Sequence, residues 1–172
     1  MAAPLSGYAE LHAWSNFTFL EGASHPEELV DRAVDLGLAA IALTDRDGLY
    51  GSVRFAAHAR KQKIDAIVGS ELTFDAECDA DRRRIVLLVE NERGYANLCE
   101  LISLAQMRGA KGDARLRTED LDGRTGGLFA LVAWNDEAAV RALRREFGER
   151  LYLELHQHLT AEDARRCEEL AR

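Results

Sequence analysis

Short apolar runs that end in a polar side chain of the metal-ligand type recur along this chain and constrain its fold most. The clearest run covers residues 38–43, contains no polar residue, and is followed by Asp45. Such an unbroken run is typical of a parallel strand that is covered on both faces. The side chains that follow these runs are His12, Asp45, Glu71 and His156. Because the carboxyl ends of parallel strands form one face of an α/β barrel, the sequence predicts a functional site at that face.

Helical patterns alternate with these strands. The predicted helices cover residues 24–36, 50–62, 94–106 and 135–147, and a last helix begins at residue 160. The predicted strands lie near residue 10 and at 38–45, 65–74, 85–89, 127–134 and 151–155. This alternation indicates a parallel α/β sheet with right-handed crossovers. A complete barrel takes about 250 residues, so we expect an incomplete barrel, either a fragment of a longer protein or a naturally shortened copy.

The composition excludes several classes of function. A formal net charge of −8 makes the domain a poor binder of phosphate backbones, so any role on nucleic acid must be local or borrowed. The three cysteines form no C-x-x-C pair, which disfavours a disulfide framework or a zinc knuckle and favours a reducing, cytoplasmic setting. No apolar run approaches the roughly 18 residues of a membrane helix, so we expect no membrane partner. Glycine-rich dinucleotide and P-loop motifs are absent from the sequence.

Imidazole and carboxylate groups on a common face are the ligand set for zinc, manganese or iron, and such metals can activate water against a phosphate ester. The alternative is that each group merely ends a strand and hydrogen-bonds to a neighbouring loop. Glu71 is the strongest candidate, because a carboxylate among apolar neighbours needs a cation, which a metal, Arg or Lys could supply. Trp14 falls on the same predicted face, where it could form an apolar plug in place of a wet metal site.

Residues 8–24, 42–51, 68–71 and 89–99 form four segments of a recognisable pattern. Together these segments resemble the N-terminal PHP (polymerase and histidinol phosphatase) domain of bacterial C-family DNA polymerase III alpha subunits. The stretch at residues 15–24, Ser-Asn-Phe-Thr-Phe-Leu-Glu-Gly-Ala-Ser, is most similar to the error-prone, translesion branch. The resemblance implies a distorted TIM-like barrel of seven strand–helix units that holds up to three metals for phosphoester hydrolysis or 3′–5′ exonuclease trimming. It also implies a parent nucleotidyltransferase that acts in DNA replication and repair.

The chain departs from the metal-binding pattern of this family at two motifs. Where the family has His-x-His the chain has His12-Ala13-Trp14, and where the family has Thr-Asp-His it has Thr44-Asp45-Arg46. Glu71 matches the bridging glutamate of the family, Glu21 could still serve as a ligand, and His156 falls near a later histidine ligand. The resemblance thus implies a degenerate metal site made of His12, Glu21, Glu71 and His156. The residues expected to line it are Trp14, Asp45 and Arg46.

Arg46 changes the chemistry of this site. A guanidinium cannot ligate a metal, but beside Glu71 it could neutralise the carboxylate. Our hypothesis is that residues 1–172 are the N-terminal part of one PHP domain, a structural module of an error-prone polymerase with no catalytic residue and no cofactor beyond residual zinc or manganese. An active metal-dependent phosphoesterase or exonuclease, and a noncatalytic barrel that binds only proteins, are the alternatives. The expected partners are the remainder of the polymerase chain, DNA through that parent, and a second copy, because open strand edges invite self-association.

Overall fold

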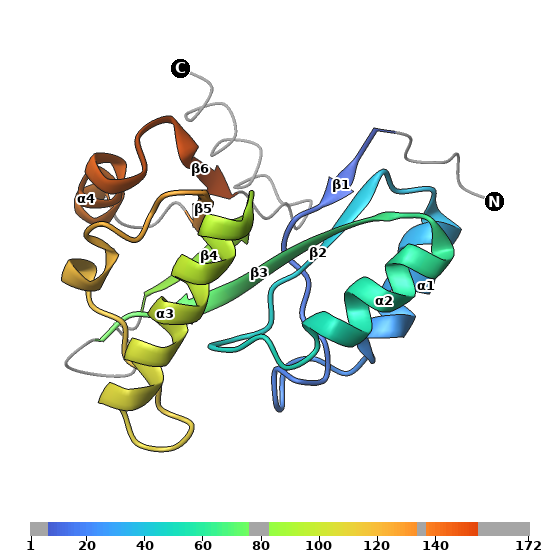
Figure 1. Ribbon diagram of the computed structural model, residues 1–172, viewed down its shortest axis with the longest axis horizontal. Coiled ribbons are helices and arrows are strands. Elements are labelled where there is room, and N and C mark those ends of the chain that lie inside the picture. Colours follow the sequence, from blue (N-terminus) through green and yellow to red (C-terminus); the bar gives the residue numbers. More distant parts are fainter. Residues whose placement is uncertain (1–6, 76–82, 134–136, 155–172) are drawn as a thin grey trace, which may run out of the picture.

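The computed structural model describes residues 7–75, 83–133 and 137–154, and the six strands found there form one sheet. In chain order the strands are β1 (Ala9–Glu10), β2 (Ala40–Leu43), β3 (Asp65–Thr73), β4 (Arg84–Val89), β5 (Leu128–Ala133) and β6 (Leu151–Glu154). The helices are α1 (Pro26–Leu36), α2 (Ser52–Gln62), α3 (Glu92–Arg108) and α4 (Glu137–Phe147), with short 3₁₀-helices at Thr118–Leu121 and Gly148–Arg150 (Figure 1). Each strand lies beside the one that precedes it in the chain.

The prediction of an all-parallel sheet is wrong for β4. Strands β1, β2 and β3 pair in parallel, and so do β5 and β6, but β4 runs antiparallel to both of its neighbours. The misreading has a physical cause, because an unbroken apolar run reports burial on both faces rather than strand direction. In β4 the four residues from Ile85 to Leu88 are all buried. The carboxyl end of β4 therefore lies at the opposite end of the sheet from the predicted site.

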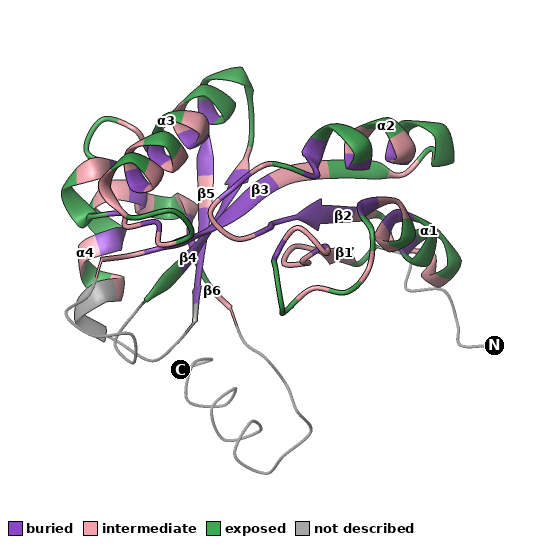
Figure 2. Cartoon of the chain, turned by 90° about the horizontal axis from the view of Figure 1, so that it is seen from below, coloured by how far each residue is buried: buried purple, intermediate pink, exposed green. Residues whose placement is uncertain are grey.

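Successive residues of the strands point to opposite faces of the curled sheet. On β4, Ile85 and Leu87 face the helices and belong to a large core shared with α3 and α4. On the same strand Val86 and Leu88 face the inside of the curl, where they pack with Ala42 and Leu131. Figure 2 shows the strands mostly buried and the outer surfaces of the helices exposed. The sheet is thus buried on both faces by two different groups of apolar side chains.

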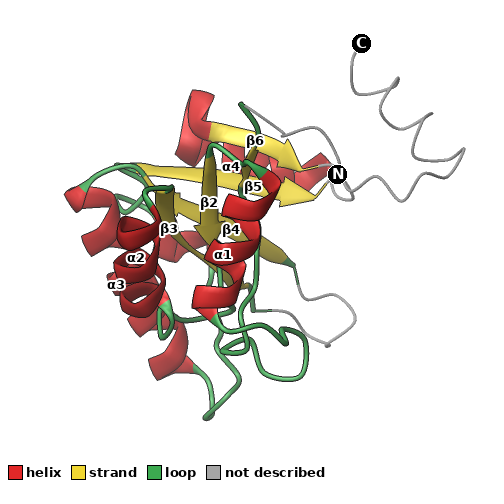
Figure 3. Ribbon diagram, turned by 90° about the vertical axis from the view of Figure 1, so that its right-hand side faces the viewer, coloured by secondary structure: helices red, strands yellow, loops and turns green. Residues whose placement is uncertain are grey.

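The helices lie outside the curled sheet (Figure 3). Helices α1 and α2 share a second outer core with β2, which contains Val30, Ile41, Leu43, Phe55 and Ala59. The result is a half-barrel of six strands with four helices outside it in the described part of the chain, which confirms the predicted incomplete, TIM-like α/β barrel.

Helix α1 begins at Pro26, two residues after the start of the helix predicted at residues 24–36. His25 is its N-cap, and the His25 backbone N–H donates to the Glu28 side chain at 2.7 Å. Pro26 explains the shift, because proline is well suited to the first helical position, where no N–H partner is needed. Gly37 follows the helix in a left-handed conformation, and the helix ends at residue 36 as predicted. None of the described helices is long and apolar enough to cross a membrane.

Candidate functional site

Glu71 lies at the centre of the candidate site. It lies within β3, two residues before the strand ends, and its side chain is only 6% exposed. Three cationic or imidazole groups surround its carboxylate. Arg46 Nε is 3.3 Å from Oε2, His12 Nε2 is 3.7 Å from Oε1, and Arg84 Nη1 is 3.9 Å from Oε2. Burial raises the pKa of Glu71 above its ordinary value, although Arg84, His12 and Arg46 all act to lower it.

Arg46 connects two carboxylates at the site. Its Nε donates to Glu71 at 3.3 Å, its Nη1 donates to Glu21 Oε1 at 2.7 Å, and its Nη2 also pairs with Glu21. The hydrogen bond from Arg46 holds the pKa of Glu21 below its ordinary value. Burial acts to lower the pKa of Arg46, but Glu21 and Glu71 outweigh it and leave the pKa raised. The expected contact between Arg46 and Glu71 is present, and the guanidinium stays charged.

His12 links the two edges of the described sheet. It follows β1, and its Nδ1 lies 2.7 Å from Oε1 of Glu154 at the end of β6. Burial is the largest influence on the pKa of His12 and lowers it, but the hydrogen bond and charge of Glu154, with the charges of Glu71 and Glu10, leave it raised. His12 is therefore held by carboxylates on two sides. Glu154 was missed in the sequence, although it ends an apolar run just as Asp45 does.

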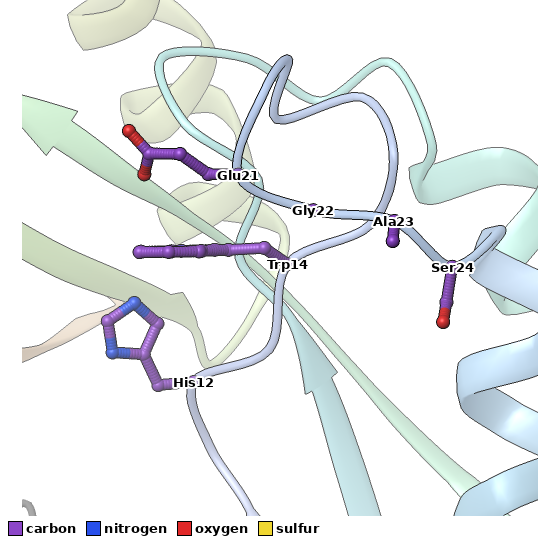
Figure 4. Close-up of a pocket in the computed structure, with 6 residues that line it drawn as sticks. All are labelled: His12, Trp14, Glu21, Gly22, Ala23 and Ser24. Carbon is purple, nitrogen blue, oxygen red and sulfur yellow. The ribbon is translucent and has the colours of Figure 1, made fainter.

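Trp14 covers the space between these groups. The Arg46 guanidinium lies over its ring at 5.4 Å, and the His12 ring meets it edge-on with centroids 5.5 Å apart. Figure 4 shows the indole between the side chains of His12 and Glu21. An open pocket of about 300 Å³ is lined by His12, Trp14 and Glu21 and by the segment Gly22, Ala23 and Ser24. An indole has a donor N–H and no free lone pair, so Trp14 cannot replace a histidine ligand.

Asp45 lies below the loop that follows His12, where it is 2% exposed. Its Oδ1 accepts the Ser15 backbone N–H at 2.7 Å and the Thr18 hydroxyl at 2.8 Å, and its Oδ2 accepts the Ser15 hydroxyl at 2.7 Å. Both carboxylate oxygens are therefore used to hold residues 15–18. This is the arrangement that the alternative interpretation of the polar strand ends describes, in which the side chain hydrogen-bonds to a neighbouring loop.

The side chains that the structure describes at the site do not form a donor set that fits a metal ion. Among residues 7–75, 83–133 and 137–154, no group of three or more His, Cys, Asp or Glu side chains could hold one. Glu21 and Glu71 both pair with Arg46, and His12 pairs with Glu154. His156, the remaining predicted ligand, lies outside the described residues. The predicted residues His12, Glu21, Glu71, Trp14 and Arg46 do meet at one mouth of the sheet, but their charges compensate one another.

Comparison with curated proteins finds relatives that are similar to this chain in sequence. The chain is 52% identical over 142 residues to an error-prone DNA polymerase of Bordetella parapertussis, a match that covers 83% of the chain and 14% of the relative. It is 44% identical over 168 residues to an error-prone DNA polymerase of Anaeromyxobacter sp. (strain K), with 92% of the chain and 15% of the relative covered. The chain thus spans about one seventh of the length of these relatives.

Solved structures share the fold at low sequence identity. A candidate metal-dependent phosphoesterase from Bifidobacterium adolescentis superposes with a TM-score of 0.62 at 16% identity, over 98% of this chain and 84% of that chain. An amidohydrolase from Chromobacterium violaceum gives a TM-score of 0.59 at 18% identity, over 95% of this chain and 82% of that chain. Residues 10–158 match the family model for the PHP domain. This match over most of the chain, together with the identity to the curated relatives, shows that the chain belongs to the PHP domain family.

Proposed function

We propose that residues 1–172 form the N-terminal part of the PHP module of a cytoplasmic error-prone DNA polymerase that acts in translesion repair, and that this module is structural rather than hydrolytic. The relatives named error-prone DNA polymerase, of which the chain spans 14–15%, support the parent. The net charge of −8 supports a division of labour in which DNA is bound by other parts of that polymerase.

The Arg46 guanidinium, paired with both Glu71 and Glu21, is the observation that carries the structural role. A metal in such a site would bring positive charge to the carboxylates and lower the pKa of a bound water. Arg46 brings the charge but has no open coordination position, so it compensates Glu71 without activating water. The site then joins the loop after β1, the end of β2 and β3 by ion pairs.

An active metal-dependent phosphoesterase or 3′–5′ exonuclease is the second candidate function. Two residues that match the family pattern, His12 and Glu71, favour this hydrolytic function. They lie close together, with His12 Nε2 3.7 Å from Glu71 Oε1. Trp14 and Arg46 argue against a hydrolytic function, because they occupy the two positions where the family pattern has histidine. The two functions make opposite predictions for the role of His12 in hydrolysis.

The test is a hydrolysis assay with manganese or zinc on p-nitrophenyl phosphate and on a DNA strand labelled at its 3′ end. We expect no hydrolysis above the blank with metal alone for the wild type, His12→Ala or His58→Ala. His58 is the matched control, because this histidine on α2 pairs with Asp31 on α1, away from the site. Hydrolysis by the wild type that His12→Ala abolishes and His58→Ala retains would overturn the structural role.

A further inference from the structure

The loop between β1 and α1 presents two large apolar side chains to solvent. Phe19 is 80% exposed and Leu20 is fully exposed. Leu20 also has a positive φ of 67°, a left-handed conformation that a residue with a Cβ rarely adopts. Neither the exposure of these side chains nor the conformation of Leu20 helps to stabilise the isolated domain.

The loop that carries Phe19 and Leu20 is held firmly on both sides of them. Asp45 binds Ser15 and Thr18 with three hydrogen bonds, and the backbone N–H groups of Glu21 and Gly22 both donate to Thr18 O. A Cβ on Gly22 would lie 1.9 Å from Ser15 O, so the backbone passes too close for any other residue. The backbone is therefore fixed on both sides of the two exposed apolar side chains.

A second apolar pair lies on the adjoining loop and the start of α2. Tyr50 is 66% exposed and Val53 is 78% exposed. The two loops touch, because the Arg46 backbone N–H donates to Thr18 Oγ1 at 3.1 Å, and a Cβ on Gly51 would lie only 3.1 Å from the Phe17 ring. We call Phe19, Leu20, Tyr50 and Val53 the apolar rim. Rigid, exposed apolar groups on neighbouring loops mark a protein contact rather than a contact with phosphates.

We propose that the apolar rim is the surface on which the remainder of the polymerase chain docks. This inference rests on the proposed parent, and the length of the relatives supports it, since the chain spans only 14–15% of them and most of each polymerase lies outside the domain. Residues beside the rim add a polar border, because Glu21 and Arg46 form their ion pair next to Leu20. The site mouth and the docking surface are thus built from the same two loops.

Cysteine accessibility in the full-length polymerase tests this docking. Leu20→Cys and, as a second variant, Phe19→Cys are labelled with a maleimide and quantified by mass spectrometry of the labelled peptide. The matched control is Lys61→Cys, an exposed residue at the far end of α2 from Val53. We expect both rim variants to react at least tenfold more slowly than the control, at every protein concentration and without DNA.

Each other outcome counts against the docking proposal. Rim and control cysteines that react equally fast would show a free surface, protection that grows with protein concentration would show a second copy, and protection only with DNA would show a nucleic-acid contact. A reading frame without polymerase segments would remove the proposed parent and the docking together. A frame that contains them, combined with a fast Leu20→Cys reaction, would overturn the docking alone.

Discussion

Replacing Arg46 with methionine should destabilise the protein by about 2–3 kcal/mol at pH 7. The variant removes the cation closest to the buried Glu71 carboxylate and leaves only His12 at 3.7 Å and Arg84 at 3.9 Å. Glu71 can escape by taking up a proton, which limits the cost to about 1.4 kcal/mol for each pH unit above its ordinary pKa. Between that value of 4.5 and pH 7 the limit is about 3.5 kcal/mol.

The same reasoning fixes the pH dependence. A carboxyl with a raised folded pKa stabilises the folded state fully only below its unfolded pKa, and that stability is lost as the pH rises through the folded pKa. Removing Arg46 enlarges this loss, so the cost of Arg46→Met should shrink towards pH 5. Adding Glu71→Gln to Arg46→Met should recover most of the loss at pH 7, because the buried Glu71 carboxylate that lost its nearest cation is then replaced by a neutral amide.

Urea unfolding followed by circular dichroism at pH 5 and pH 7 measures these costs. The matched control is Arg54→Met, which breaks the exposed pair of Arg54 and Glu27 at 2.7 Å and should cost about 0.5 kcal/mol or less. A cost for Arg46→Met that equals that of Arg54→Met at pH 7, or one that is the same at both pH values, would refute the account of the ion pair.

The remaining predictions concern two loop residues, the ion pair of Arg108 and Asp120, and the open edges of the sheet. Asp45→Asn should cost about 3 kcal/mol in urea unfolding, because an amide cannot accept all three buried hydrogen bonds, and a cost below about 1 kcal/mol would contradict this. Gly22→Ala should lower the melting temperature more than Gly112→Ala, where a Cβ meets open space and only the positive φ of 81° disfavours alanine, and equal shifts would contradict the close approach at Gly22. The hydrogen bond from Arg108 lowers the pKa of Asp120, so this pair stabilises the fold above pH 3.8 and the contribution is lost as the pH falls through the lower folded pKa. The free energy of unfolding of Asp120→Asn should therefore fall less than that of the wild type as the pH is lowered. An equal fall in both proteins would contradict a stabilising role for the pair. Light scattering of the isolated chain should find self-association at micromolar concentration, and a sharp monomer peak would count against it.

Much of the fold follows from local sequence signals. The apolar run that forms β2 and the end of α1 at residue 36 both follow from the spacing of apolar residues in the sequence. The direction of β4 does not follow, because its residues are buried on both faces whichever way the strand runs. The deciding feature is the reversal between β3 and β4, where the sequence is charged and aperiodic.

The candidate site was predictable where charge and position agree. Glu71 in an apolar strand needs a cation, and Arg46 follows the neighbouring strand, so their contact could be expected from the sequence. The partner of His12 could not, because Glu154 is 142 residues away and only the curl of the sheet brings the two together. Asp45 lies at the end of its strand as predicted, but its carboxylate turns toward the loop at residues 15–18 and away from the site. The position of a residue at a strand end does not reveal which way its side chain turns.

Anomalous diffraction at the manganese edge, from crystals of the protein soaked in manganese chloride, tests the central claim most directly. We predict no anomalous peak within bonding distance of the Glu71 carboxylate, with the Arg46 guanidinium in its place between Glu71 and Glu21. A peak on the Glu71 carboxylate with Arg46 displaced would show that the site still binds metal and would contradict the account.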